Sequence, residues 1–271
     1  MTNNLKFYIN GKWVEPISKD ILDVINPANE EIITQISLGN KEDLDLAVNS
    51  AKDSFDTWSM TSVDYRLDLL HKLKNIYQTR FDEMTKAITL EMGCPNNFAS
   101  KVQTQSGLDH LDDFIQRLKN FEFEKKFNKN SNNYITQEPI GVCGLITPWN
   151  WPINQIALKV IPALAVGCTM ILKPSEIAPL SGILFTEMID EAGFPPGVYN
   201  LVNGNGDGVG NAISCHPDID MISFTGSTRA GRLILKNSSE TIKRVCLELG
   251  GKGGNIVFAD APKNSVRDSI R

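Results

Sequence analysis

The chain of 271 residues carries 27 lysine and arginine residues against 32 aspartate and glutamate residues, so its formal net charge is −5. This charge gives no electrostatic reason to expect binding to nucleic acid or to an anionic membrane. No apolar run reaches the roughly 20 residues that span a bilayer, and the start Met1-Thr2-Asn3-Asn4 lacks the basic and apolar layout of a signal peptide. We therefore expect a cytoplasmic protein with no nucleic-acid or membrane partner.

The cysteines do not form a recognisable framework. They are odd in number and widely spaced, and no Cys-x-x-Cys or histidine pair accompanies them; they are Cys94, Cys143, Cys168, Cys215 and Cys246. Zinc sites and disulfide scaffolds both require regular spacing. We expect no metal, and we interpret each cysteine as a reduced, packed side chain.

The amino-terminal third predicts a hairpin followed by helices. Asn10-Gly11 lies between two short apolar runs, and both residues tolerate the positive φ of a type I′ turn. Apolar residues then recur at helical spacing from Lys41 to Trp58, again over 67–88, and in a third stretch over 98–118 that includes Phe98 and Val102. We expect these stripes to be core or packing faces.

The composition changes at Phe121 to a polar, charged segment that ends near Asn133. Such a segment is exposed rather than buried, and the residues fit a solvated loop and a protruding strand about equally well.

From Gly141 onward, short β-branched runs alternate with helical stretches. The runs predict strands over 142–147, 169–173, 198–202, 221–225 and 244–247, with helices near Gln155, Phe185, Val209 and Leu233. Strands and helices that alternate at this spacing predict an α/β fold with a doubly wound parallel sheet. Ligands bind such sheets at the carboxyl ends of the strands.

Two glycine-containing turns follow predicted strands. The segment 204–210 is glycine-rich, but Val209 stands where Gly-x-Gly-x-x-Gly requires its last glycine, so a plain loop fits as well as a nucleotide-binding turn. In Phe224-Thr225-Gly226-Ser227-Thr228, Ser227 can cap the following helix. The free N–H groups of that helix can also face an anion.

Other polar residues at strand ends have both ordinary and functional interpretations. Lys173 and Glu176, three residues apart, would usually form a weak surface pair. Asn150, between two tryptophans, fits a turn residue. Glu248 lies in an apolar strand end, where desolvation would raise its pKa toward that of a general base, although most such carboxylates are simply paired.

Four segments of this chain resemble the aldehyde dehydrogenase superfamily in order and approximate spacing. They are Ile146-Thr147-Pro148-Trp149-Asn150, Lys173-Pro174-Ser175-Glu176, Phe224-Thr225-Gly226-Ser227-Thr228 and Leu247-Glu248-Leu249-Gly250-Gly251-Lys252. The resemblance implies a Rossmann-like NAD-binding domain over 1–120 and 140–250, a protruding oligomerisation arm over 121–139, and the start of a truncated catalytic domain over 251–271. A homodimer or homotetramer is the implied assembly.

The resemblance also implies where the cofactor binds. Lys173 donates to, and Glu176 accepts from, the hydroxyls of the adenine ribose, while Gly226 and Ser227 contact the pyrophosphate. A carboxylate at position 176 repels a 2′-phosphate, which favours NAD over NADP. The complete expected set is Ile146, Thr147, Pro148, Trp149, Lys173, Glu176, Gly206, Gly210, Phe224, Gly226, Ser227, Leu249 and Gly250.

The implied reaction is NAD-dependent oxidation of an aldehyde to a carboxylic acid through a cysteine thiohemiacetal and thioester. Asn150 would stabilise the oxyanion and Glu248 would activate the hydrolytic water. The family's nucleophile lies beyond the Glu-Leu-Gly-Gly-Lys segment, but no cysteine follows Lys252 here. Neither Cys168 nor Cys246 fits its context, so we expect this chain by itself to be inactive.

Three interpretations follow. The chain is part of an NAD-dependent aldehyde dehydrogenase, or a naturally truncated and inactive remnant that binds nucleotide or associates with other subunits, or a different hydride-transfer enzyme such as a Rossmann alcohol dehydrogenase. The third is weakest because it explains neither Asn150 nor Glu248.

Overall fold

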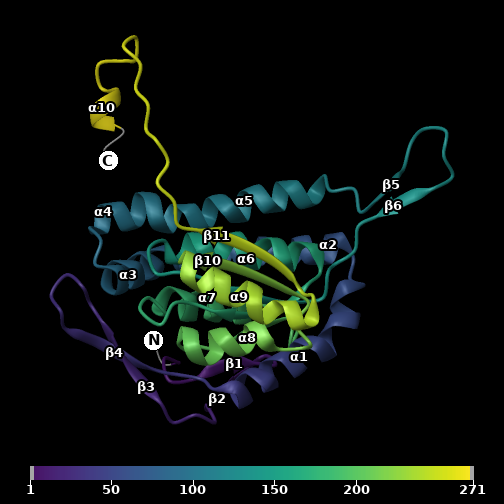
Figure 1. Ribbon diagram of the computed structural model, residues 1–271, viewed down its shortest axis with the longest axis horizontal. Helices are drawn as coiled ribbons and strands as arrows, with labels where there is room; N and C mark the ends of the chain where they lie inside the picture. The colour runs from purple at the N-terminus through teal and green to yellow at the C-terminus, as the bar shows by residue number, and fades with distance from the viewer. Residues whose placement is uncertain (1–2, 269–271) are drawn as a thin grey trace.

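The computed structural model describes residues 3–268, and within that range the core is a seven-stranded sheet in the order β11-β10-β7-β8-β9-β1-β2 (Figure 1). Five strands run parallel: β7 (Val142–Ile146), β8 (Thr169–Lys173), β9 (Tyr199–Leu201), β10 (Met221–Gly226) and β11 (Arg244–Leu249). The predicted α/β fold with a doubly wound sheet is therefore confirmed.

An antiparallel hairpin completes one edge of the sheet. Strands β1 (Phe7–Ile9) and β2 (Lys12–Val14) pair with each other, and β1 also pairs with β9. Asn10 and Gly11 adopt φ values of 52° and 71°, as the predicted turn requires. Two polar contacts fix the hairpin on the sheet: Asn10 N–H donates to Asn200 Oδ1 at 3.0 Å, and the Tyr8 hydroxyl donates to Asp190 at 2.9 Å.

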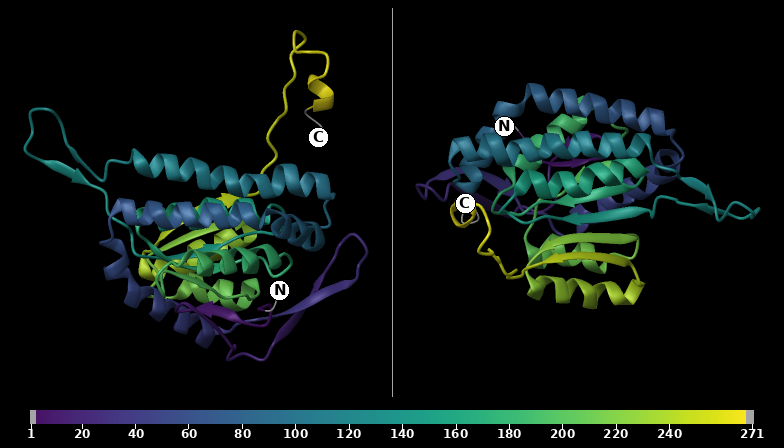
Figure 2. Two further views of the ribbon diagram at one scale, coloured as in Figure 1. Left: turned by 180° about the vertical axis from the view of Figure 1, so that it is seen from behind. Right: turned by 90° about the horizontal axis from the view of Figure 1, so that it is seen from above.

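Helices cover both faces of the sheet (Figure 2). One face carries α1 (Lys41–Ser59), α8 (Asn211–Cys215) and α9 (Thr228–Ser238); the other carries α6 (Pro152–Val166) and α7 (Leu180–Ala192), with α2 (Val63–Thr79), α3 (Phe81–Met92) and α5 (Gln105–Lys119) packed outside them. Because side chains alternate along a strand, Val142 and Ile146 pack on the α1 side while Cys143 and Leu145 pack on the α6 side. The sheet thus has two separate apolar cores.

Two helix predictions need correction. The stripe over 67–88 is interrupted at Arg80, where α2 ends and α3 begins. The third stretch contains α4 (Asn96–Phe98) and a π-helical turn over Ala99–Thr104 before α5. Phe98 and Val102 are 38% and 37% exposed, so neither lies in the core, although the Phe98 ring packs edge-on against Trp151. A π-helical turn holds an extra residue and moves these side chains off the 3.6-residue stripe.

Two hairpins lie outside the central sheet. Strands β3 (Ile21–Ile25) and β4 (Ile32–Ser37) form a pair that the sequence analysis missed, although the Asn26-Pro27 turn between two apolar runs was a usable signal. Strands β5 (Glu124–Lys126) and β6 (Tyr134–Thr136) form an exposed arm that projects from the body (Figure 1). Of the two alternatives for this segment, the protruding strand is therefore the one found.

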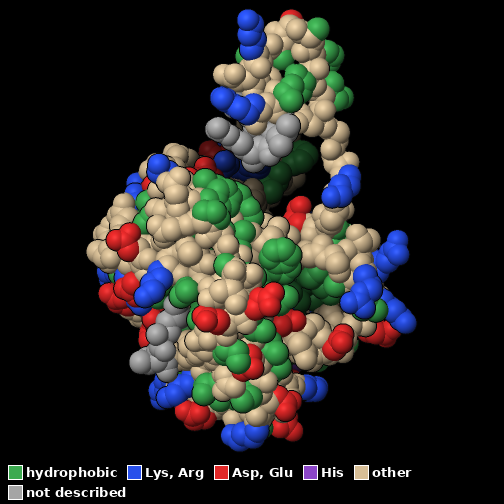
Figure 3. All heavy atoms as spheres, turned by 90° about the vertical axis from the view of Figure 1, so that its left-hand side faces the viewer, with side chains coloured by type: hydrophobic (Ala, Val, Ile, Leu, Met, Phe, Trp, Pro, Cys, Tyr) green, Lys and Arg blue, Asp and Glu red, His purple; other side chains and the backbone are tan. Residues whose placement is uncertain are grey.

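After β11 the chain leaves the body as an extended segment that ends in α10 (Ser265–Asp268) (Figure 1). Three of its apolar residues, Ile256, Val257 and Phe258, are exposed. Hydrophobic side chains also gather on the face of the body below this segment (Figure 3). No helix within residues 3–268 is long and apolar enough to cross a membrane.

A buried carboxylate joins α3 to α7. Glu91, near the end of α3, is 1% exposed and accepts hydrogen bonds from the N–H groups of Leu180 and Ser181 at the start of α7, the second at 3.1 Å. These N–H groups have no acceptor within their own helix. Glu91 therefore caps α7 from a different element.

Candidate functional site

The residues expected to bind the cofactor gather at the carboxyl ends of the parallel strands, in two clefts on opposite faces of the sheet. The first, which we name the α9 cleft, has a volume of about 140 Å³ and is lined by Ile146, Lys173, Gly206, Gly210 and Phe224 among others. The second, named the α6 cleft, has a volume of about 740 Å³ and is lined by Pro148, Trp149, Asn150, Gly226, Ser227, Glu248, Leu249 and Gly250 among others. Thr147 and Glu176 line neither cleft.

Lys173 is the buried cation of the α9 cleft. Its side chain is 3% exposed, and Nζ donates to the carbonyls of Pro174 and Gly204 at 2.9 and 2.5 Å and to the Glu176 carboxylate at 3.1 Å. Burial lowers the pKa of Lys173, and the charge of Glu176 opposes that shift. Lys173 and Glu176 are therefore not the weak surface pair that their spacing allowed.

The glycine turn on the floor of the α9 cleft is a single π-helical turn, Gly206–Gly210. Asn205 caps it by accepting a hydrogen bond from the N–H of Gly208 at 2.6 Å. A Cβ added at Gly206 would meet nothing within 4 Å, so the backbone there borders open space that a ligand could approach closely.

Ser227 serves as a helix cap, as the ordinary interpretation predicted. Its hydroxyl accepts a hydrogen bond from the N–H of Ala230 at 3.2 Å, and its backbone is extended. The cap leaves other N–H groups of the first turn of α9 directed toward the cleft, where the helix dipole favours an anion. Capping and anion binding are thus compatible at this helix.

The α6 cleft brings together the two residues expected to act in catalysis. Asn150 lies in the turn before α6, and the amide of the fully buried Gln103 donates to its backbone carbonyl at 3.4 Å. Glu248 lies on β11 in register with Thr225 of β10. Residues almost a hundred positions apart therefore share one cavity.

Glu248 differs from its expected environment. Leu247 packs on the α9 side of the sheet, so Glu248 faces the opposite side, where its side chain is exposed within the described residues. The burial expected from its apolar sequence neighbours is therefore absent: those neighbours lie on the other face. Two cysteines, Cys215 and Cys246, are likewise exposed rather than packed.

Lys159 is a site residue that the sequence analysis missed. It is 8% exposed, lines the α6 cleft and donates to Ser223 Oγ at 3.1 Å. Burial lowers its pKa, while nearby Cys246 and Glu248 oppose the shift. The available signal was a lone lysine inside the apolar stretch of α6.

Thr147 follows β7, between the two clefts. Its backbone N–H donates to the carbonyl of Lys173 at 3.2 Å, and its buried Oγ1 has no hydrogen-bond partner within residues 3–268. A buried unpaired hydroxyl is costly unless a ligand or water satisfies it.

Within residues 3–268, no group of three or more histidine, cysteine or acidic side chains is arranged to hold a metal ion.

In doubly wound α/β proteins, ligands, dinucleotides among them, bind at the carboxyl ends of the strands, where these polar residues lie. Residues 13–270 match the model of the aldehyde dehydrogenase family, and the chain belongs to that family.

Individual curated proteins are also similar to this chain in sequence. The chain is 50% identical over 273 residues to a 3-succinoylsemialdehyde-pyridine dehydrogenase of a Pseudomonas species, covering 100% of this chain and 57% of that protein. It thus spans about half the length of such relatives.

Solved structures show the same fold. An aldehyde dehydrogenase from Bartonella henselae superposes with a TM-score of 0.97 at 52% identity, covering 100% of this chain and 57% of the other. A variant of aldehyde dehydrogenase C from Pseudomonas syringae, in complex with NAD+ and octanal, gives 0.93 at 45% identity, covering 96% and 53%. Betaine aldehyde dehydrogenase from Staphylococcus aureus, in complex with NAD+, gives 0.94 at 33% identity, covering 99% and 54%.

Proposed function

We propose that this chain binds NAD over the carboxyl edge of the sheet, with the adenosine in the α9 cleft and the nicotinamide in the α6 cleft. The observation that carries the proposal is the buried Lys173 with Glu176 beside it, a donor and an acceptor suited to two ribose hydroxyls. The open backbone at Gly206 and the first turn of α9 fit a pyrophosphate. The unpaired hydroxyl of Thr147 offers a further polar contact.

In the longer proteins with which this chain aligns, we propose that the site oxidises an aldehyde to a carboxylic acid. Bound NAD supplies the hydride acceptor. The Asn150 amide donates to the oxyanion formed when a thiolate adds to the aldehyde, and Glu248 takes a proton from the water that hydrolyses the resulting thioester. Lys159 lines the same cleft as Glu248, and the charge of Glu248 raises the pKa of Lys159 against the lowering by burial.

The attacking thiol is proposed to lie outside these 271 residues. Cys246 lines the α6 cleft, but it lies two residues before Glu248 on the same strand, so both side chains leave the same face of the sheet. The setting of Cys246, inside the strand that carries the proposed base, does not match that of the family's nucleophile.

The test measures binding and turnover separately on the 271-residue chain. Titration calorimetry is expected to show NAD binding, while mixing with NAD and octanal is expected to give no NADH absorbance. Absence of NAD binding to the folded chain would overturn the first proposal. Turnover by this chain would overturn the proposal that the attacking thiol lies outside these 271 residues. If that turnover were lost in Cys246→Ala, Cys246 would be the nucleophile.

A specific observation supports the alternative of a nucleotide-binding or subunit-association remnant. The arm of β5 and β6 is wholly exposed, and an exposed strand pair offers unpaired backbone groups to a partner. We propose that this arm mediates a homodimer or homotetramer. Sedimentation gives the mass of the chain and of a variant that lacks residues 122–136. We expect an oligomer for the chain and a monomer for the variant; a monomer in both cases would contradict the proposed role of the arm.

Glu176→Gln is expected to relax the preference for NAD over NADP by about tenfold, because the substitution removes the charge that repels a 2′-phosphate while keeping a hydrogen-bonding oxygen. The measurement is the ratio of the two dissociation constants. Glu83→Gln, at an exposed carboxylate on α3, is the matched control and should leave that ratio unchanged. An unchanged ratio in Glu176→Gln would place the ribose elsewhere.

A further inference from the structure

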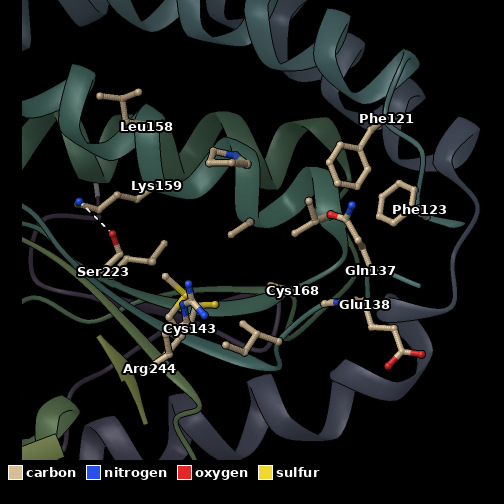
Figure 4. A pocket seen from close by; sticks show the side chains of 17 residues that line it. Phe121, Phe123, Gln137, Glu138, Cys143, Leu158, Lys159, Cys168, Ser223 and Arg244 are labelled. Atoms are coloured by element: carbon tan, nitrogen blue, oxygen red, sulfur yellow. Dashed lines mark hydrogen bonds between the residues drawn. The ribbon is translucent and has the colours of Figure 1, made fainter. Parts of the chain in front are cut away.

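A third cavity, of about 410 Å³, lies on the α6 face of the sheet at the amino ends of β7 and β8, the opposite strand ends from the cofactor clefts (Figure 4). Its walls are mainly apolar side chains of the segment before the arm and of α6, including Phe121, Phe123, Leu158, Pro162 and Val166. We name it the thiol cavity; Leu158, Lys159 and Ser223 line both this cavity and the α6 cleft, and Lys159 donates a hydrogen bond to Ser223 there.

Two cysteines lie side by side in the wall of the thiol cavity. Cys143 belongs to β7 and Cys168 comes directly before β8, and Figure 4 shows their side chains together. The Cys143 side chain and the backbone N–H groups of Ile140 and Gly141 favour a negative charge on the Cys168 sulfur.

The thiolate form of Cys168 is favoured by these donors. The hydrogen bond from Cys143 lowers the pKa of the Cys168 thiol, burial opposes the shift, and the N–H groups of Ile140 and Gly141 add to the lowering. Conversely, the hydrogen bond to Cys168 and burial raise the pKa of Cys143. The pair therefore divides into one nucleophile and one proton donor.

A buried arginine supports the same charge. Arg66 on α2 is 4% exposed; its Nε donates to the carbonyl of Ala165 at 2.9 Å, and its guanidinium lies 5.5 Å from the centre of the Phe123 ring. Burial lowers the pKa of Arg66, and the charge of Cys168 opposes that shift. No carboxylate within residues 3–268 forms an ion pair with this guanidinium. The other charged groups around the cavity are Glu138, Lys159, Asp220 and Arg244.

We propose that Cys168 is a modification site for soft electrophiles that have an apolar body, namely α,β-unsaturated carbonyl compounds, and that the thiol cavity binds that body. The site is separate from aldehyde oxidation, because it lies at the other ends of the strands. An apolar cavity of this size holds a small organic ligand. A cysteine among cationic and N–H donors is the kind that reacts.

The step is a conjugate addition and requires no oxidant. The Cys168 thiolate forms a bond to the β-carbon while the π electrons move to the carbonyl oxygen. The enolate then takes a proton at its α-carbon from water, and the proton that left Cys168 returns to solvent. The net change is addition of S–H across the carbon–carbon double bond.

The test compares two neutral maleimides on the folded 271-residue chain at pH 7: apolar N-phenylmaleimide and an analogue that carries a polyhydroxylated chain in place of the ring. The reaction is quenched with acid, and modified peptides are quantified by mass spectrometry. Because the mainly apolar walls leave hydroxyl groups without partners, N-phenylmaleimide is expected to modify Cys168 at least about tenfold faster than the analogue does. The exposed Cys215 and Cys246 should show no such preference and serve as internal controls.

Two variants test the role of the partner thiol. Cys143→Ala removes the donor, so the pH midpoint of Cys168 modification is expected to rise toward the value of about 8.5 for an ordinary thiol. Cys143→Ser keeps a donor and should retain the low midpoint.

Three results would overturn the proposal. The first is modification of Cys215 and Cys246 alone. The second is a Cys168 rate that reaches the same plateau with both maleimides, because modification would then be limited by unfolding and not by binding in the cavity. The third is a midpoint that is unchanged in Cys143→Ala.

Discussion

Replacing Lys173 by methionine is expected to weaken NAD binding by about 10- to 100-fold, because a hydrogen bond to a charged group contributes about 1.5–3 kcal/mol. The ammonium has little freedom to adjust, since it is 3% exposed and held by the carbonyls of Pro174 and Gly204. A ribose hydroxyl that binds there takes the N–H that the Glu176 carboxylate accepts in this structure, while the two carbonyls hold the ammonium in position, so little entropy is lost on binding. Titration calorimetry measures the change.

The control must separate a lost contact from a disturbed fold. Lys243→Met is matched, because Lys243 is also buried and donates to a carbonyl, that of His216 at 2.5 Å. Lys243 comes directly before β11, an edge strand, at the opposite strand ends from Lys173. The variant should leave NAD affinity unchanged. An NAD analogue without adenine ribose hydroxyls should bind wild type and Lys173→Met equally; if the variant weakened both ligands alike, Lys173 would not contact the ribose.

Glu91→Ala is expected to lower the free energy of unfolding by about 2–5 kcal/mol, since each buried donor left without a partner costs about 1–3 kcal/mol. The donors concerned are the N–H groups of Leu180 and Ser181. Urea denaturation measures the change. Glu83→Ala, on the same helix but exposed, is the control and should cost less than about 1 kcal/mol. Equal losses in the two variants would show that Glu91 is not a cap.

The same carboxylate should make stability depend on pH. Burial raises the pKa of Glu91 from 4.5 to about 7, against the hydrogen bonds from Ser181 and Leu180. Because the folded-state pKa lies above the unfolded value, the stabilising contribution is fully present below about pH 4.5 and is lost as pH rises through about 7. The stability of wild type relative to Glu91→Gln should therefore fall over that interval. A difference that does not vary with pH would contradict the shift.

The sheet could be predicted because its signals are local. Each parallel strand is a short apolar run bounded by turns, and the strand that begins at Thr169 and ends at Lys173 was placed without error. The break at Arg80 and the displaced side chains of Phe98 and Val102 were not predictable in this way. Helix periodicity registers neither a one-residue interruption nor a π-helical turn.

The sequence motifs name candidate site residues but not the geometry of the clefts that these residues line. The motifs located Asn150 and Glu248, whereas their assignment to the α6 face depends on strand alternation. Glu248 was expected to be buried because its sequence neighbours are apolar, although those neighbours pack on the opposite face. Lys159 was missed because a lysine in an apolar helix acquires meaning only when its neighbours in space are known.

The amino-terminal hairpin has a consequence for how the chain folds during synthesis. Strand β1 is made first, yet it completes its sheet only against β9, where Tyr8 is in register with Leu201. At about 5–20 residues per second, the ribosome needs roughly 10–40 s to make the intervening residues. Phe7, which is fully buried in the finished fold, has no sheet to cover it during that interval. The first strand made is thus among the last to be placed, and chaperones that shield nascent apolar segments have their longest opportunity there.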